Sequence, residues 1–299
     1  MTGVRPDVSV VVPTFDRPRR LALCLQALAA QDYPRDGFEV VVVNDGGSPP
    51  EEAVAAARGR LALTLVHQEN AGPAAARNRG AELARGRILA FTDDDCAPAP
   101  DWLRLLGDRV AADPECLVGG RTVNAMRDVP CAEASQLLVD YLYAHYGGGA
   151  RDGGNDGPRF FTSNNFALAR DRFMELGGFD ASFPRAAGED RDFCDRWSLR
   201  GWRMRLVPEA VVHHSHDMGL RGYWRQHFAY GAAAYHFHRL RAQRAASPVR
   251  VEPPSFYGRL VLYPFSRRPP LRASMLSTLL LLSQVANTAG YAAARWGGE

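Results

Sequence analysis

The sequence predicts an α/β protein with a mostly parallel central sheet flanked by helices and a helical C-terminal extension. Two observations support this prediction. Apolar runs without polar alternation recur in the N-terminal part of the chain, and a helical pattern follows each run. Strands of this kind, separated by helices, form sheets that are covered on both faces. The expected strands are residues 8–12, 38–43, 63–67 and 88–92. A first helix is expected directly after Asp16, which would cap it, and further helices are expected over 51–58, 73–84 and 100–111.

The pattern changes after residue 123. A glycine-rich stretch at 147–157 predicts a loop that could act as a lid, and a short strand is expected near 165–169. A helix over 190–199 and a short strand at 204–207 follow. The segment 220–243 alternates aromatic and basic residues, as a helix lying on a surface does. The protein core is the favoured place for its aromatic rings, with lipid or a partner subunit as alternatives.

The charge of the chain is small overall but unevenly distributed. A formal net charge of +3 over 299 residues does not indicate a nucleic-acid-binding protein. From residue 219 to the end there are eleven arginines and only two glutamates, so the rest of the chain is acidic, as a site built from carboxylates would be. The basic C-terminal part is a candidate for peripheral contact with an anionic membrane.

The cysteines and the apolar stretches bear on the cellular location. Five scattered cysteines form no CxxC pair, which favours reduced core cysteines and a cytoplasmic protein. No apolar export segment precedes the first expected strand. The longest apolar stretch, 275–294, is interrupted by six polar side chains, so a membrane span is not expected. The predicted location is therefore the cytoplasm, with the inner face of the cell membrane as a peripheral site.

The strongest local signal is the run Phe91-Thr-Asp-Asp-Asp-Cys96, directly after an apolar strand. Three like charges at one strand end are costly unless a cation or hydrogen-bond donors neutralise them. Mg²⁺ or Mn²⁺ bridging to phosphate oxygens would do so with one or two protein carboxylates. The alternative is a solvated acidic turn that caps the next helix.

Two further residues are expected at the same edge of the sheet. Asp45 follows the second strand, where it can accept hydrogen bonds from a base or a ribose, or form a simple turn with Gly46. Arg77 lies near the start of the helix expected at 73–84. It could bind a diphosphate by bidentate donation, or form a structural ion pair with the acidic strand ends. Both alternatives place Arg77 beside the site.

Acidic residues and histidines in the later part of the chain are further candidates. Glu189 and Asp190 open a helix, where acidic residues commonly just complement the helix dipole. Alternatively, one of these carboxylates could act as a base that takes the proton from a hydroxyl nucleophile, with Asp190 as the first candidate and Glu189 as the second. Three imidazoles lie within residues 213–216, without the cysteine partners of a zinc finger. His214 and His216 are candidate ligands of an ion held by Asp95, and ordinary surface or core histidines are the alternative.

Together these pieces resemble the family 2 glycosyltransferases of the GT-A fold, in particular non-processive bacterial members. The order and spacing of the motifs over about residues 8–200 are more specific than any one of them. The segments that carry the resemblance are VVVPTFDRP (10–18), VVVNDGG (41–47), NAGPAAARNRG (70–80), FTDDDC (91–96), TSNNFALARDRFMELGGFD (162–180) and GEDRDFCDRW (188–197).

The resemblance implies an inverting transfer of one sugar from a nucleoside-diphosphate sugar to an acceptor hydroxyl, with Mn²⁺ or Mg²⁺. It also implies a catalytic domain over 1–215, with a nucleotide-binding half (1–123) and an acceptor half (124–215), and a basic, aromatic-rich helical extension over 216–299. Taken with the residues above, the expected donor-binding residues are Pro13, Thr14, Asp45, Arg77, Asp93, Asp94, Asn164 and Asn165. The expected metal ligands are Asp93 and Asp95 with His214 or His216, and the expected base is Asp190 beside Glu189.

Other functions fit the sequence less well. The segment around Trp197 lacks the QxxRW form of processive synthases, which disfavours polymer synthesis with export. A sugar-phosphate nucleotidyltransferase would need a glycine-rich phosphate loop after the first strand, which residues 13–18 do not provide. The alternative from another class is a non-catalytic nucleotide-sugar-binding or membrane-scaffold protein. Glycan, lipid-linked and small-molecule acceptors all fit the sequence, and a homo-oligomer is a candidate assembly.

Overall fold

The computed structural model of the chain describes residues 5–147, 160–183, 187–245 and 252–297. The described residues fall into two units. The first unit draws on residues 1–123, 150–182 and 189–215, and the second on residues 124–149, 183–188 and 216–299. Residues 148–157 of the expected lid lie outside the described residues.

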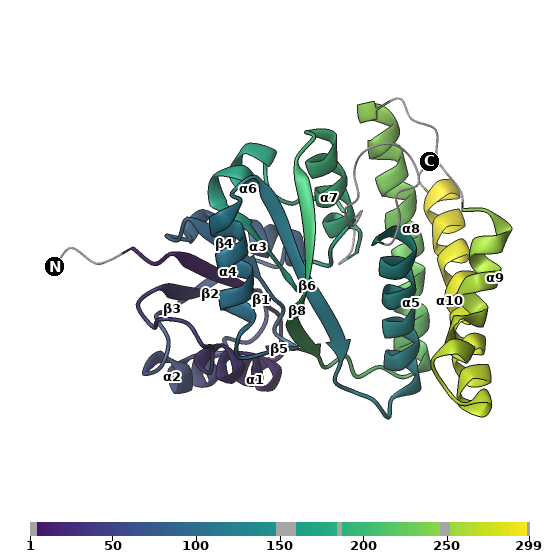
Figure 1. Cartoon of the computed structure of the whole chain (residues 1–299), viewed down its shortest axis with the longest axis horizontal. Helices are drawn as coiled ribbons and strands as arrows, with labels where there is room; N and C mark the ends of the chain where they lie inside the picture. The colour runs from purple at the N-terminus through teal and green to yellow at the C-terminus, as the bar shows by residue number, and fades with distance from the viewer. Residues whose placement is uncertain (1–4, 148–159, 184–186, 246–251, 298–299) are drawn as a thin grey trace. The chain divides into compact units, whose positions relative to one another are not determined.

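A single sheet forms the centre of the first unit (Figure 1). Within the described residues it has eight strands in the order β3-β2-β1-β4-β7-β6-β8-β5. The strands are β1 (Val8–Thr14), β2 (Phe38–Asp45), β3 (Leu63–Gln68), β4 (Ile88–Phe91), β5 (Cys96–Pro98), β6 (Cys116–Asn124), β7 (Phe166–Ala169) and β8 (Arg203–His214). β3, β2, β1 and β4 are parallel, whereas β7 pairs antiparallel with β4 and β6, and β5 pairs antiparallel with β8. The predicted α/β fold with a helix-flanked central sheet is confirmed.

Helices connect the strands of the parallel half. They are α1 (Pro18–Ala29), α2 (Glu51–Arg58), α3 (Gly72–Leu83) and, after β5, α4 (Trp102–Ala112). The expected cap of α1 by Asp16 is wrong, because Arg17 takes the N-cap position and Pro18, with its fixed φ, begins the helix. Asp16 instead has a φ of +51° and accepts the backbone N–H of Ser48 at 2.8 Å.

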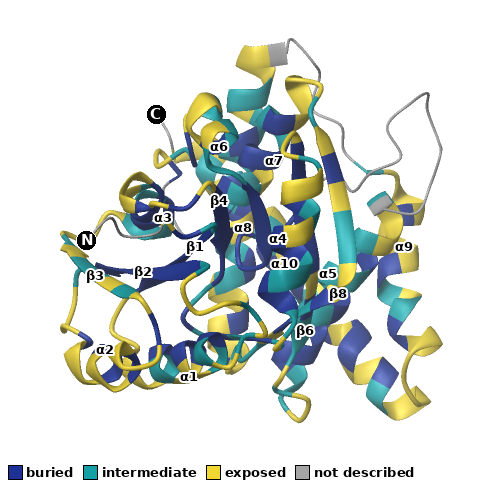
Figure 2. Cartoon of the chain, turned by 60° about the vertical axis from the view of Figure 1, so that its left-hand side comes forward, coloured by how far each residue is buried: buried dark blue, intermediate teal, exposed yellow. Residues whose placement is uncertain are grey.

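Close packing fixes the strand ends of the first unit. A Cβ atom on Gly80 of α3 would collide with Cγ1 of Val11 in β1, so glycine is needed for the helix to lie this close to the sheet. Further along the sheet, α6 (Arg170–Leu176) and α7 (Glu189–Leu199) contribute to a buried aromatic cluster. The cluster consists of Phe91, Phe166, Phe173, Phe179 and Phe193. Figure 2 shows the strands of this region as buried.

Strand β8 is much longer than the short strand expected at 204–207. It extends to His214 because Ala210 and Val212 are buried while their neighbours are more exposed, the alternation of a strand with one covered face. Pro208, which cannot donate to a strand ladder, hides this continuity in the sequence. His213 and His214 therefore lie within the strand, and their side chains point to opposite faces.

The second unit is helical. It contains α5 (Pro130–Gly147), α8 (Leu220–Ala245), α9 (Pro254–Leu262), the 3₁₀ turn η1 (Tyr263–Ser266) and α10 (Pro270–Trp296). Figure 1 shows α5, α8 and α10 side by side. A Cβ on Gly231 of α8 would collide with the carbonyl of Asn287, and a Cβ on Gly290 of α10 would collide with the carbonyl of Phe228. In the described part of the chain, no helix has the length and apolar character needed to cross a membrane.

Candidate functional site

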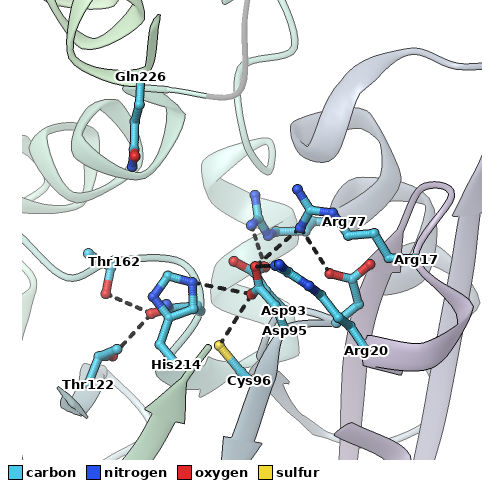
Figure 3. Close-up of polar contacts among 12 residues, drawn as sticks. Arg17, Arg20, Arg77, Asp93, Asp95, Cys96, Thr122, Thr162, His214 and Gln226 are labelled. Atoms are coloured by element: carbon cyan, nitrogen blue, oxygen red, sulfur yellow. Dashed lines mark hydrogen bonds and ion pairs between the residues drawn. The ribbon is translucent and has the colours of Figure 1, made fainter. Parts of the chain in front are cut away.

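Three carboxylates, those of Asp93, Asp94 and Asp95, follow β4 at its carboxyl end, where Figure 3 labels Asp93 and Asp95. Asp94 is buried and accepts a hydrogen bond from Oγ1 of Thr14 at 2.7 Å, which ties the end of β4 to the end of β1. Pro13 and Thr14 are both buried at this end of β1. Burial raises the pKa of Asp94 to about 6, although the hydrogen bond from Thr14 and the charge of Arg17 act in the opposite direction.

Two arginines that the sequence analysis did not single out face these carboxylates. Nη1 of Arg17 lies 3.3 Å from Oδ1 of Asp94 and 3.2 Å from Oδ2 of Asp95. Nη1 of Arg20 lies 3.3 Å from the same Oδ2 atom. The signal that could have found them is the run of arginines directly after β1, at the sheet edge where ligands of parallel sheets bind. Partly exposed guanidinium groups at this position suit a diphosphate.

Asp95 also lies in a group of three potential metal ligands. Its Oδ1 atom is 3.3 Å from Nε2 of His214 and 3.8 Å from Sγ of Cys96, and the ligand atoms of the three residues lie within 4.8 Å of one another. The antiparallel pairing of β5 with β8 creates the group by placing Cys96 opposite His214. Burial alone would lower the pKa of His214, but the hydrogen bond and charge of Asp95 outweigh it and raise the pKa.

The chemistry of this group fits a divalent cation. The carboxylate of Asp95 suits Mn²⁺ or Mg²⁺, and the imidazole of His214, which suits Mn²⁺ less well than an oxygen ligand does, is the second candidate ligand. Burial raises the pKa of the Cys96 thiol well above its usual range, so the thiol stays protonated and is a poor ligand for a hard cation. His213 is exposed on the other face of β8, and His216 lies beyond the strand, in the second unit. Asp95 and His214 are therefore the pair that fits best in the first unit.

Arg77 is buried and joins two acidic residues. Its Nη2 atom donates to Oδ1 of Asp93 at 2.6 Å, and its Nη1 atom donates to Oε1 of Glu189 at 3.1 Å. Of the two alternatives for Arg77, this geometry supports the structural ion pair, because both terminal nitrogens are engaged. Desolvation is the main reason that the pKa of Glu189 rises to about 7, with the neighbouring Asp190 adding to it and Arg77 opposing it.

Asp190 follows Glu189 in the first turn of α7. Its Oδ1 atom accepts the backbone N–H of Arg191 at 2.7 Å, and its carboxylate also interacts with the backbone of Ser163. Desolvation raises the pKa of Asp190, which these backbone hydrogen bonds and the charge of Arg77 only partly offset. A half-buried carboxylate with a raised pKa has the properties of a general base.

Asp45 is bound into the chain at the end of β2. Its Oδ1 atom accepts from Nε2 of Gln68 at 2.7 Å and from the backbone N–H of Ala71 at 2.9 Å. Its Oδ2 atom accepts the backbone N–H of Gly72 at 2.8 Å. Asp45 thus holds the first turn of α3, the helix that carries Arg77. Its carboxylate is therefore more than part of a simple turn, and both of its oxygens already accept hydrogen bonds from the chain itself.

The two neighbouring asparagines have different environments. Oδ1 of Asn164 accepts hydrogen bonds from Thr162 at 2.8 Å and from Thr122 at 3.2 Å. Asn165 is only 1% exposed, and its side chain accepts from Nε1 of Trp102 at 2.8 Å and donates to the carbonyl of Ala210 at 3.2 Å. The side chain of Asn165 therefore connects α4 to β8 inside the first unit.

Comparisons with known proteins identify the family of this chain. The family model described as glycosyl transferase family 2 matches residues 9–177. The chain is 36% identical over 124 residues to glycosyltransferase AglE of Haloferax volcanii, an alignment that covers 40% of each protein. It is 31% identical over 221 residues to the glucosyl-dolichyl phosphate glucuronosyltransferase of the same organism, covering 69% of this chain and 68% of that protein. The chain thus matches less than half the length of AglE.

A solved structure shows the same fold. The mannosyltransferase PcManGT from Pyrobaculum calidifontis, in complex with GDP-Man and Mn²⁺, is similar with a TM-score of 0.63 and 24% identity, over 99% of this chain and 89% of that one. This similarity confirms the GT-A fold. Because the family model covers more than half of the chain, and a relative above 30% identity aligns with more than two thirds of it, this chain belongs to glycosyl transferase family 2.

Proposed function

We propose that this chain is a metal-dependent glycosyltransferase that moves a single sugar, with inversion, from a nucleoside-diphosphate sugar to an acceptor hydroxyl. The observation that carries the proposal is the meeting of Asp94 and Asp95 with Arg17 and Arg20 at the strand ends of the first unit. Such a donor needs a carboxylate to hold a divalent cation, and it needs guanidinium groups to bind its diphosphate. The GDP-Man and Mn²⁺ bound to the mannosyltransferase of similar fold support the same class of donor.

The donor would bind along the carboxyl ends of β1, β2 and β4. Pro13 and Thr14 would border the base, and Asp45 would hold the start of α3 next to it. Asp95 and His214 would hold Mn²⁺ or Mg²⁺, with Asp93 as the third candidate ligand; the bound cation supplies a Lewis acid at the diphosphate oxygens. The residues with indirect roles in this proposal are Asp94, Arg77 and Asn165, which position their neighbours, while Asn164 would line the sugar pocket.

The reaction would be a direct displacement at the anomeric carbon. The acceptor oxygen forms a bond to this carbon on the face opposite the diphosphate, while the bond from the carbon to the diphosphate oxygen breaks and the diphosphate leaves with the electron pair. The proton of the acceptor hydroxyl passes to Asp190, whose raised pKa makes it a better proton acceptor near neutral pH. Arg17 and Arg20 stabilise the negative charge that gathers on the leaving group.

Among glycan, lipid-linked and small-molecule acceptors, a lipid-linked acceptor is the one we favour. One relative is named for a dolichyl-phosphate-linked acceptor. The basic C-terminal part of the chain supports the same choice, because arginines attract an anionic membrane surface. In this proposal the chain works at the inner face of the cell membrane as a peripheral protein.

Nucleotide binding can be tested by thermal unfolding with a panel of nucleoside diphosphates, each with and without Mn²⁺. A ligand at about a hundred times its Kd raises the free energy of unfolding by about 2.7 kcal/mol, which is readily visible. We expect one nucleotide to stabilise the wild type strongly only when Mn²⁺ is present, and Asp95→Ala to lose this effect. Asp108→Ala, at an exposed carboxylate of α4, should keep it. If no nucleotide stabilises the folded protein, the proposed function is wrong.

Donor turnover separates an enzyme from a non-catalytic nucleotide-sugar-binding protein. Release of the nucleoside diphosphate from its sugar should be measurable for the wild type, and Asp190→Asn should slow it about 10²- to 10⁴-fold without weakening nucleotide binding. Asp171→Asn, an exposed acidic residue in the first turn of α6, is the matched control. Normal turnover in Asp190→Asn would remove Asp190 as the base, and donor binding without any turnover would favour the non-catalytic protein.

A further inference from the structure

The outer face of α10 is exposed and carries large apolar side chains. Leu271, Met275, Leu281 and Val285 share this face with the hydroxyl side chains of Ser274, Thr278 and Thr288. Leu271 is 88% exposed and Val285 is 57% exposed. The other side of α10 packs within the second unit through Ala273, Leu276, Leu280 and Ala286. A helix that is apolar on both sides is normally covered on both, so the outer face lacks its cover among the described residues.

Exposed apolar residues also occur in the segment that precedes α10. Leu262, the last residue of α9, is 64% exposed, and Phe265 in η1 is also exposed. Every residue from 265 to 271 is exposed. We use the name apolar face for the exposed residues Leu262, Phe265, Leu271, Met275, Leu281 and Val285.

Arginines lie before, among and after the residues of the apolar face in the sequence. Between residues 253 and 298 the sequence has no carboxylate side chain and five arginines, namely Arg259, Arg267, Arg268, Arg272 and Arg295. Arg267 and Arg268 are exposed in the turn itself. Glu133 of α5 pairs with Arg268 and Arg272 and neutralises one unit of charge, so the surface keeps a positive excess.

The combination of charge and apolar area selects among partners. A two-fold dimer through this face would bring the same positively charged surface of both copies together, because an isologous interface uses one patch on each subunit. The arginines of the two copies would then repel each other. A nucleic acid would meet charge only at the two ends of α10, since residues 273–294 carry no charged side chain. An anionic lipid surface satisfies both features, because aliphatic side chains enter the acyl boundary while arginines meet the head groups.

We propose that the apolar face docks on an anionic lipid surface, with α10 lying in the plane of the membrane. This inference deepens the membrane contact of the proposed function by naming the surface that makes it. The surface differs from the aromatic and basic segment 220–243 that the sequence singles out, because Tyr223, His227 and Phe237 of that segment are buried within the second unit.

Vesicle flotation of the full chain tests the docking. The probes are vesicles of phosphatidylcholine alone and vesicles of phosphatidylcholine mixed with phosphatidylglycerol. We expect the wild type to float with the mixed vesicles, to bind the neutral ones more weakly, and to lose affinity as salt is added. Absence of binding to the mixed vesicles at low salt would overturn the docking.

Paired variants separate the apolar and the electrostatic parts. Leu271→Gln combined with Val285→Gln should weaken binding to the mixed vesicles by roughly tenfold or more. Arg259→Gln combined with Arg267→Gln should weaken it by roughly twenty-five-fold, at about fivefold for each arginine. The matched controls change residues of the first unit that are also exposed. They are Leu23→Gln with Leu199→Gln and Arg58→Gln with Arg60→Gln, and both should bind as the wild type does.

Two further measurements make the outcomes distinct. Circular dichroism and the melting temperature verify that each variant is folded, and nucleotide-dependent stabilisation reports on the proposed function separately. Nucleotide binding without vesicle binding would overturn the docking alone, whereas vesicle binding without nucleotide binding would leave the docking intact and remove the transferase. If light scattering shows a dimer that Leu271→Gln with Val285→Gln converts to a monomer, and no vesicles bind, the face is a self-interface and the docking is wrong.

Discussion

Arg77 and Glu189 form a buried ion pair in the first unit, with 3.1 Å between Nη1 of Arg77 and Oε1 of Glu189. The other terminal nitrogen of Arg77 lies 2.6 Å from Oδ1 of Asp93. One guanidinium therefore joins α3, the end of β4 and the start of α7. Because Arg77 is only 4% exposed, water cannot replace a lost partner, and removing one member leaves an uncompensated buried charge.

Substitution of Arg77 is expected to destabilise the protein strongly. Arg77→Met should lower the free energy of unfolding by about 3–5 kcal/mol, because Glu189 and Asp93 then lose their counter-charge. Adding Glu189→Gln should recover part of this loss, since an amide costs less to bury than an unpaired carboxylate. Urea denaturation measures both. The control is Arg79→Met, which removes an exposed pair with Glu82 and should cost less than about 1 kcal/mol. Equal stability of the two methionine variants would contradict the role of the buried pair.

The metal ligands can be distinguished by two substitutions in neighbouring strands. With the nucleotide that binds best, His214→Gln should weaken Mn²⁺ binding by at least about tenfold, the loss that is usual even for an outer-shell partner. Cys96→Ser should leave Mn²⁺ affinity nearly unchanged, because a sulfur ligand suits a hard cation poorly. Electron paramagnetic resonance of free Mn²⁺ measures both affinities. The reverse pattern would assign Cys96, and not His214, as the ligand beside Asp95.

Asn165 should matter for stability and not for nucleotide affinity. Asn165→Ala removes the hydrogen bonds that its side chain makes with the indole N–H of Trp102 and the carbonyl of Ala210. Each buried group left unsatisfied costs about 1–3 kcal/mol, so the free energy of unfolding should fall by roughly 2–6 kcal/mol. The nucleotide affinity of the folded variant should stay at the wild-type value in a calorimetric titration. A variant with normal stability and weakened nucleotide binding would assign Asn165 to the donor pocket.

The second unit contains a buried histidine that makes stability depend on pH. Burial, with a smaller contribution from the charge of His216, lowers the pKa of His227 to about 4 from its ordinary value of 6.5. Above pH 6.5 both the folded and the unfolded state hold it neutral. As the pH falls from 6.5 to 4, only the unfolded state gains the proton, so the free energy of unfolding decreases by up to about 3 kcal/mol.

His227→Phe is expected to remove this component. The difference in unfolding free energy between the wild type and His227→Phe, measured in denaturant at several pH values, should change steadily between pH 6.5 and 4. A difference for His227→Phe that is independent of pH would mean that His227 is protonated equally well in both states.

The sequence predicts those parts of the fold and site that depend on local periodicity. The strands β1 to β4 and the carboxylates after β4 follow from apolar runs and from the rule that parallel strands end at one edge. The start of α1 and the length of β8 are predicted wrongly from the sequence. Pro18 begins α1, which moves the N-cap from Asp16 to Arg17, and Pro208 interrupts the strand pattern of β8. The partners of Arg77 and Asn165 have no local signal, because Glu189 and Trp102 are far from them in the sequence.

Gly231 and Gly290 let α8 and α10 touch backbone to backbone. With no side chain between the two helices at these points, sliding or rotation of one along the other would drive neighbouring Cβ atoms into carbonyl oxygens. The last helix of the chain therefore cannot shift without α8. A pulling force applied at the C-terminus, as in an optical-trap experiment, should load both helices together and release them in one step rather than peel α10 away first.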